Sequence, residues 1–160
     1  MTTKPDDIAD RQIVIRRDFD VPARILFLAH SKPEHVKRWF GPVGWPLTMC
    51  EMDFRVGGQF RFAMTGESGV QNAPFGGEYL VIEPDRNITY DNGFLDAGSP
   101  RFVVEIVFEE RDGKTSLTMT STFETKAIRD QHVELGFEAG VNSGLDQLGD
   151  VATELAGKVV

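Results

Sequence analysis

Residues 125–155 read TKAIRDQHVELGFEAGVNSGLDQLGDVATEL, and this stretch decides the fold. Apolar residues recur along it at steps of three and four, the spacing typical of one face of an α-helix. A single helix over the whole stretch would be about 45 Å long, which is long for a chain of 160 residues. We therefore predict one long C-terminal helix whose apolar face is buried by the rest of the chain.

Three glycines, Gly136, Gly140 and Gly144, follow one another along this helix at intervals of four residues. Each glycine costs a helix about 1 kcal/mol relative to alanine, so a compensating feature is expected. Two explanations are open. Either the helix backbone packs closely on a sheet, or space is left beside the helix.

Upstream of the helix, residues 47–65 predict a β-hairpin. Two strand-like runs, 47–54 and 59–65, are joined by Val56-Gly57-Gly58, a three-residue loop with glycine at hand for the left-handed position. Closing the hairpin on Arg55 and Gln59 makes one face apolar and the other charged. The facing pairs are then Met52–Phe62, Cys50–Met64, Phe54–Phe60 and Asp53–Arg61.

Four more strands are predicted at residues 77–83, 87–94, 102–110 and 115–123, and Asp112-Gly113 between the last two is a strong hairpin signal. Alternation in the last two strands separates inward from outward side chains. The inward sets are Phe102, Val104, Ile106 and Phe108 in one strand, and Leu117, Met119, Ser121 and Phe123 in the other.

The N-terminal region adds one strand and two short helices. Residues 11–19 are β-branched in their centre and predict the strand. Asp20 is expected to cap a helix that ends near residue 30, and Ser31 with Glu34 forms a capping box for a second helix that ends near Phe40. Residues 1–10 are interpreted as a flexible leader, and 11–160 as a single domain.

This order of elements predicts an α+β fold. A curved antiparallel sheet of about seven strands wraps around the long C-terminal helix, with two short helices after the first strand. A sheet and a helix that are each apolar on one side bury those sides against each other.

Composition narrows the function. The formal net charge is −8, and no stretch combines clustered Lys and Arg with aromatic residues, so we expect neither nucleic acid nor an anionic membrane as a partner. A single cysteine, no 20-residue apolar run and no signal-peptide pattern favour the cytoplasm. No motif for a cofactor or for a metal centre is present.

Five segments of the chain stand out as motifs. They are Arg17–Pro22 (RDFDVP), Pro33–Pro42 (PEHVKRWFGP), Glu51–Phe60 (EMDFRVGGQF), Phe75–Tyr79 (FGGEY), and Val107–Glu110 (VFEE) followed by Gly113–Thr115 (GKT). These segments resemble a known family, the homologues of the activator of the heat-shock-protein-90 ATPase. The resemblance extends from about Ile13 to Leu155.

This AHSA-like family belongs to the START-like helix-grip superfamily (SRPBCC), which also contains polyketide cyclases and plant lipid-binding allergens. The resemblance implies a helix-grip fold with a cavity between the sheet and the long helix, and no shared catalytic set. Many members have a tryptophan after the helix glycine, where this chain has Val141. The smaller side chain either enlarges the cavity or is compensated by Phe137.

The inward-facing aromatic and methionine residues are the candidate ligand-binding set, because binding pockets are mostly apolar with a few polar groups. The alternative is that the same residues close-pack as an ordinary core. The candidates are Trp39, Trp45, Met52, Phe60, Phe62, Met64, Phe75, Phe102, Val104, Met119, Phe137 and Val141.

Candidates for acid–base chemistry are few. Only His132, Tyr79 and Tyr90 are ionisable groups expected near the cavity. Glu51 and Asp53 form a carboxylate pair, but the hairpin register places them on the charged face, away from the aromatic residues. Cys50 alternates with apolar residues and is interpreted as a buried, inert thiol, while His30 and His35 have no metal-binding spacing.

Three hypotheses of function result. The first is binding of a small, largely hydrophobic ligand in the cavity. The second is a cyclase- or hydrolase-like enzyme that uses the same cavity. The third, which the family name suggests, is a chaperone cofactor or stress-response interaction protein. A homodimer is compatible with all three.

Overall fold

The structure is a computed structural model that describes residues 7–158. Seven strands form one antiparallel sheet in the order β1-β7-β6-β5-β4-β3-β2. The strands are β1 (Gln12–Phe19), β2 (Leu47–Met52), β3 (Gln59–Met64), β4 (Phe75–Glu83), β5 (Asn87–Asn92), β6 (Phe102–Arg111) and β7 (Lys114–Phe123). The helices are η1 (Ile8–Arg11), α1 (Ala23–Ser31), α2 (Pro33–Trp39), α3 (Lys126–Glu134) and α4 (Phe137–Lys158). The predicted α+β class is confirmed.

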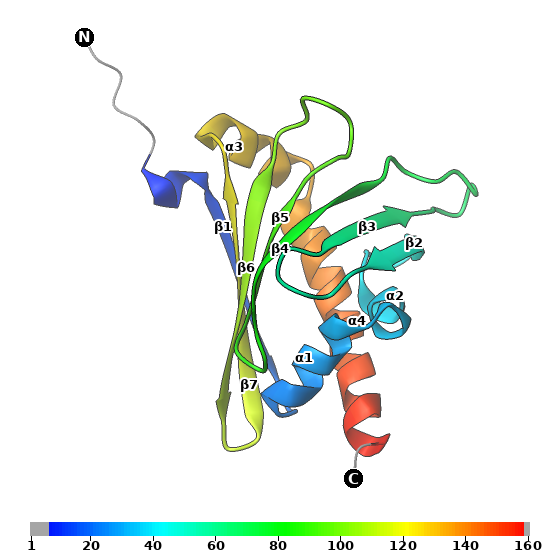
Figure 1. Ribbon diagram of the computed structural model, residues 1–160, viewed down its shortest axis with the longest axis vertical. Coiled ribbons are helices and arrows are strands. Elements are labelled where there is room, and N and C mark those ends of the chain that lie inside the picture. The colour runs from blue at the N-terminus through cyan, green and yellow to red at the C-terminus, as the bar shows by residue number, and fades with distance from the viewer. Residues whose placement is uncertain (1–6, 159–160) are drawn as a thin grey trace.

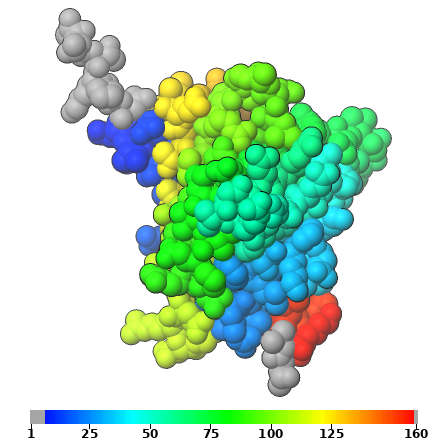
Figure 2. All heavy atoms as spheres, viewed as in Figure 1, coloured from blue at the N-terminus to red at the C-terminus, as the bar shows by residue number. Residues whose placement is uncertain are grey.

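The molecule has two layers, the curved sheet and the helices α1, α2 and α4 (Figure 1). Helix α4 crosses the concave side of the sheet and packs against α1, α2 and β1, while α2 also contacts β2 at the opposite edge (Figure 1). In the space-filling view the strands and the β2–β3 hairpin hide most of α4 (Figure 2). No helix in the described part of the chain is long and apolar enough to cross a membrane.

The predicted long C-terminal helix is confirmed as α4, but its predicted start near Thr125 is wrong, because residues 126–134 form the separate helix α3. Helix α3 begins after Thr125, whose side-chain oxygen accepts the Ile128 N–H at 3.1 Å, and it ends at Glu134. Gly136 then adopts a φ of +83°, a left-handed conformation that ends a helix and that glycine reaches without strain. The apolar spacing continues across this break because α4 restarts within two residues.

Close packing explains one of the other two glycines, and the packing is not against the sheet. A Cβ added at Gly144 would lie 3.3 Å from the backbone oxygen of Trp39, at the end of α2. A Cβ added at Gly140 would lie 3.9 Å from the Pro42 side chain, which leaves room for alanine. Gly140 and Gly144 both face the segment that leads from α2 to β2, but only Gly144 is packed tightly against it.

The β2–β3 hairpin keeps the predicted faces but changes the predicted register by two residues. Met52 pairs with Phe60 and Glu51 pairs with Arg61, so Asp53 does not face Arg61. The Asp53 N–H donates to the Gln59 carbonyl, which closes a wider loop than the predicted one. A shift of two preserves which side chains point inward. The Asp112-Gly113 hairpin between β6 and β7 is confirmed, with both residues at positive φ.

The two predicted side-chain caps near the N-terminus are wrong. Helix α1 begins after Pro22, and the Ala23 N–H donates to Oε1 of Glu110 at 2.7 Å, so a distant carboxylate serves in place of Asp20. Helix α2 begins after Lys32 with no side-chain cap. The Ser31 hydroxyl instead donates to the Leu28 carbonyl at 2.8 Å.

The interval expected to be a leader, residues 1–10, is only partly described. Residues 1–6 lie outside the described residues. The described part contains most of η1, a short 3-10 helix that contacts α3 and β7.

Candidate functional site

A transverse row of five inward-facing residues crosses the middle of the sheet. The register pairs Ile13 with Ser121, Ser121 with Val104, Val104 with Tyr90, and Tyr90 with Tyr79. Adjacent strands lie about 4.8 Å apart, so about 10 Å separates the backbones of Ser121 and Tyr90. Apart from Ser121, these residues belong to the core cluster that includes α4, or pack against it. The row is therefore the floor of the space between the sheet and α4.

The structure brings eleven of the twelve candidate ligand-binding residues together in or against this core. Those that are buried are Trp39, Phe60, Phe62 and Val104. Those that are partly exposed are Met52, Met64, Phe75, Phe102, Met119, Phe137 and Val141. Trp45, with 37% of its surface exposed, lies outside the group.

Partial exposure reaches the centre of the sheet. Met119 is partly exposed although its two cross-strand neighbours, Ile15 and Ile106, retain only 6% and 4% exposure. Tyr90 is partly exposed between Val104 at 0% and Tyr79 at 4%. A close-packed core leaves no accessible surface at such positions. Some accessible surface therefore remains at Met119 and Tyr90, although the residues paired with them across the sheet are buried.

Two hollows lie elsewhere on the described surface. One, of about 400 Å³, follows the end of β1 and the facing side of α4, and it contains Phe19, Asp146 and Asp150. The other, of about 450 Å³, is lined by polar and charged side chains of β1, β6 and β7. A ligand held between the sheet and α4 would require side chains to move. Three of the partly exposed residues are methionines, whose unbranched side chains re-pack readily.

Aromatic rings fill the part of the interior nearest β3 and β4. The Phe60 ring lies 4.9 Å from Phe62, 5.3 Å from Tyr79 and 5.2 Å from Tyr90, measured between centroids. These separations are typical of favourable edge-to-face or tilted ring pairs. Rings therefore pack on one another at this end of the interior, whereas Met119 and Val141 lie outside this cluster of rings.

Three hydroxyl groups on the floor are without hydrogen-bond partners. Burial raises the pKa of both Tyr79 and Tyr90, which keeps the two phenols protonated and able to donate. Neither phenol has a hydrogen-bond partner within residues 7–158. The Ser121 Oγ is fully buried and also lacks one.

His132 lies at the α3 end of this interior inside a group of phenylalanine rings. Its ring centroid is 4.4 Å from Phe123, 5.6 Å from Phe102 and 5.8 Å from Phe137. Its Nδ1 lies 2.9 Å from the Ile128 carbonyl oxygen, so Nδ1 carries the hydrogen. Nε2 has no protein partner within residues 7–158.

General acid–base catalysis needs a polar partner for one of these groups. In the described chain, no hydrogen bond joins His132, Tyr79 or Tyr90 to another side chain.

The remaining candidate groups are either exposed or packed as part of the core. Glu51 and Asp53 are exposed on the outer face, and Asp53 pairs with Arg55 at 2.8 Å. Cys50 is half-buried, and burial raises the pKa of its thiol to about 11, so the thiol stays protonated near neutral pH. His30 is buried between Trp39 and Phe108, with ring centroids 4.7 and 5.5 Å away.

Trp45 covers a loop at the margin of the sheet. Its indole ring lies against Gly66, where an added Cβ would come within 2.8 Å of the ring. Both residues belong to segments that flank β2 and β3. Trp45 is therefore a rim residue in this structure, and any part in binding would be at an entrance.

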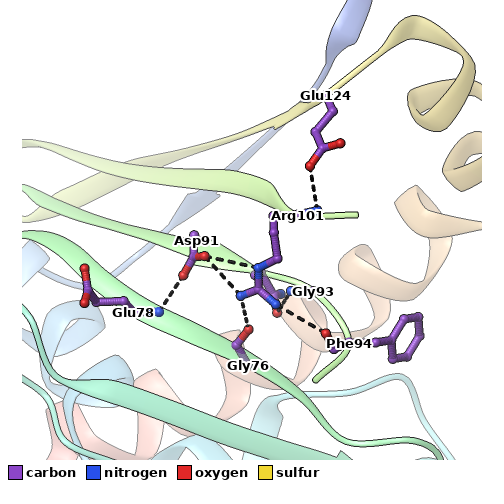
Figure 3. Close-up of polar contacts among 8 residues, drawn as sticks. Gly76, Glu78, Asp91, Gly93, Phe94, Arg101 and Glu124 are labelled. Atoms are coloured by element: carbon purple, nitrogen blue, oxygen red, sulfur yellow. Dashed lines mark hydrogen bonds and ion pairs between the residues drawn. The ribbon is translucent and has the colours of Figure 1, made fainter. Parts of the chain in front are cut away.

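A second rim segment, residues 93–100, is fixed by Arg101 (Figure 3). The guanidinium of Arg101 donates to Oδ2 of Asp91 at 3.1 Å, to the Gly76 carbonyl at 2.5 Å and to the Phe94 carbonyl at 3.3 Å. Oδ1 of Asp91 accepts the Glu78 N–H. One side chain thus ties this segment to β4 and β5 beside Phe102.

Sequence reasoning did not assign a role to Ser121 or Arg101. Ser121 was visible as the one polar member of the inward set in β7, and that position is confirmed. That its hydroxyl has no hydrogen-bond partner depends on tertiary packing, which the alternation of residues along a strand does not predict. Arg101 has no local signal, because its partners are 7 to 25 residues away in sequence.

A curved antiparallel sheet that wraps a long C-terminal helix makes this protein a helix-grip protein. A family model described as "Activator of Hsp90 ATPase homolog 1-like protein" matches residues 20–153, and the chain belongs to that family. No curated protein matches the chain significantly.

Solved structures give the same fold. A protein from Arthrobacter aurescens is 26% identical, with a TM-score of 0.84 over 93% of this chain and 90% of that one. A protein from Staphylococcus epidermidis is 29% identical, with a TM-score of 0.76 over 96% and 94%. A Silicibacter pomeroyi protein of the same family is 21% identical, with a TM-score of 0.73 over 89% and 99%. These names give no ligand or activity.

Proposed function

We propose that this protein binds a small, largely hydrophobic molecule between the sheet and α4. The observation that carries the proposal is the partial exposure of Met119 in β7 and Tyr90 in β5, each between buried cross-strand neighbours. A folded core closes such positions unless they face a space that something else occupies.

The chemistry of the surrounding side chains agrees with this proposal. The partly exposed inward residues are methionine, phenylalanine, tyrosine and valine, which gain free energy when an apolar ligand displaces water from them. Val141 and Phe137 of α4 pack against the core cluster, as Met119 of β7 does. A molecule lying there would contact both the helix and the sheet.

A fluorescence titration with N-phenyl-1-naphthylamine, a neutral apolar dye, tests the proposal. We expect the dye to bind the wild-type protein with one site per chain. Val141→Trp, which adds a large ring to the inward side of α4, should weaken binding at least tenfold. Native mass spectrometry of gently purified protein adds an independent measurement, because a retained ligand would be seen as an added mass.

Val133→Trp is the matched control. Val133 lies on α3 with 48% of its surface exposed, so the same substitution there adds a ring outside the interior. The control should bind the dye as the wild type does. Equal affinities for Val141→Trp and Val133→Trp, with both variants folded by circular dichroism, would place the dye elsewhere and overturn the proposal.

A further inference from the structure

The Ser121 hydroxyl is an unusual feature of the interior. Ser121 is 1% exposed, and its Oγ is the one buried side-chain polar atom within residues 7–158 that has no hydrogen-bond partner. Buried polar groups are almost always paired, because an unpaired one has lost its water without compensation. An alanine or valine would pack on this strand without that cost.

A second unpaired donor lies in the same row. The Tyr90 phenol shares the inward face with Ser121, two strands away, and only the fully buried Val104 lies between them. Tyr90 is partly exposed and its hydroxyl has no protein partner in the described chain. The two hydroxyl groups lie on one face of the sheet without protein partners, and a molecule that displaces the side chains over Ser121 could bind both.

Two arginines on elements that border this interior are already paired. Arg17 is the arginine of β1 that faces α4, and it donates to Asn142 and Asp146. Arg129 is bound to Asp130 and to the Gln12 carbonyl. Within residues 7–158 no cationic side chain is bound to Ser121 or Tyr90, so a carboxylate placed between them would lack a bound counter-charge, which is unfavourable in a buried position.

We propose that Ser121 and Tyr90 form the polar end of the binding site and select a neutral molecule with one hydrogen-bonding oxygen, an alcohol or a ketone on an apolar body. This inference rests on the proposed function, and it adds the chemical class of the ligand. The apolar body contacts Met119, Val141 and Phe137, and the oxygen lies toward the row of hydroxyls.

Four compounds of similar size separate the possibilities: naphthalene, 2-naphthol, methyl 2-naphthyl ketone and 2-naphthoate. Dissociation constants from equilibrium dialysis should be lower for the alcohol and the ketone than for naphthalene by about threefold to tenfold, the usual effect of one added hydrogen bond. The naphthoate should bind more weakly than all three neutral compounds.

Two variants assign the effect to the named residues. In Ser121→Ala and in Tyr90→Phe, the ratio of the dissociation constants for naphthalene and 2-naphthol should move toward one. The dissociation constant for naphthalene itself should stay as in the wild type. Ser116→Ala is the matched control, because Ser116 lies on the same strand with its hydroxyl on Asp18 at the outer face. It should leave all four affinities unchanged.

The outcomes distinguish this inference from the proposed function. If naphthalene and the dye bind but both variants keep the wild-type preference for 2-naphthol, the polar end is not Ser121 and Tyr90, and the proposed function stands. If 2-naphthoate binds more tightly than 2-naphthol, the inferred class is wrong. If neither the dye nor any of the four compounds binds, the proposed function fails and this inference fails with it.

Discussion

Gly144 of α4 lies against the backbone of Trp39. A Cβ added at Gly144 would lie only 3.3 Å from the Trp39 carbonyl oxygen, which is a tight contact. The neighbouring Gln147 uses its Nε2 to donate to that same oxygen at 3.2 Å and to the Gly41 carbonyl at 2.7 Å. The end of α2 would otherwise have unpaired carbonyl groups. One turn of α4 therefore both approaches and caps α2.

The glycines of α4 should differ in their response to alanine. Gly140→Ala should raise the free energy of unfolding by about 0.5–1 kcal/mol, because alanine favours the helix and the nearest atom to its Cβ is 3.9 Å away. Gly144→Ala should raise the free energy of unfolding less than Gly140→Ala does, or should lower it. Its added Cβ would press on the Trp39 backbone at the end of α2. Urea denaturation of the two variants measures the difference. Equal stabilisation of both would show that the Trp39 backbone moves easily.

Gly136→Ala should have the opposite effect to Gly140→Ala. Gly136 has a φ of +83° at the junction of α3 and α4, and alanine in the left-handed region costs roughly 1 kcal/mol or more. No atom beyond its chain neighbours lies within 4 Å of the added Cβ, so the cost is conformational rather than steric. Gly136→Asn should be milder, because asparagine tolerates this conformation better than alanine. A stabilised Gly136→Ala variant would indicate that α3 and α4 join into one helix.

Gln147→Leu should lower the free energy of unfolding by about 1–3 kcal/mol, since it leaves the carbonyls of Trp39 and Gly41 without their donor. Gln131→Leu, on the exposed side of α3, is the control and should change stability little. Thermal unfolding followed by circular dichroism gives both values. A Gln147→Leu variant as stable as the control would mean that water replaces the amide at no cost.

The sequence was sufficient for the order of the elements and for the inward faces, because both depend on short-range spacing. Alternation placed Val104, Met119 and Ser121 on one face, and the structure has them there. The errors concern features decided by distant contacts. The α1 cap comes from Glu110, 87 residues away, and no local signal around Asp20 could have excluded it.

The same division applies to the site. The apolar character of the interior was predictable from composition on the inward faces. The break at Gly136 was not, because a periodicity of three and four continues through it and a glycine within a helix resembles a glycine that ends one. Whether Trp45 faces the core also depended on the position of Gly66, which loop sequence does not fix.

Arg101→Gln should loosen the rim segment of residues 93–100. The substitution removes the ion pair with Asp91 at 3.1 Å and the bond to the Gly76 carbonyl, which anchor this segment to the sheet. We expect faster hydrogen exchange in residues 93–100, with exchange in β7 unchanged. Arg86→Gln, an exposed arginine in the turn before β5, is the control and should not alter this segment. Unchanged exchange in Arg101→Gln would mean that the Phe75–Phe94 bridge alone holds it.

Stability should depend on pH through His30. Burial lowers the pKa of His30 from 6.5 to about 4, while the hydrogen bond from Nδ1 to the Leu26 carbonyl at 2.7 Å acts in the opposite direction. The unfolded chain therefore binds a proton more readily than the folded one between pH 6.5 and about 4. The His30 contribution is fully present above pH 6.5 and is lost as the pH falls through this window. The loss amounts to about 3 kcal/mol.

His30→Leu tests this origin, because it keeps an apolar side chain between Trp39 and Phe108 but cannot bind a proton. Carboxylates also contribute to acid unfolding, so the quantity to compare is the slope of unfolding free energy against pH. This slope is proportional to the number of protons that the chain takes up when it unfolds. Between pH 6.5 and 4, that number should be smaller for His30→Leu than for the wild type, by up to one proton. His35→Gln, a histidine substitution on α2, should keep the wild-type slope. Equal slopes for His30→Leu and the wild type would mean that His30 takes up its proton without unfolding the core.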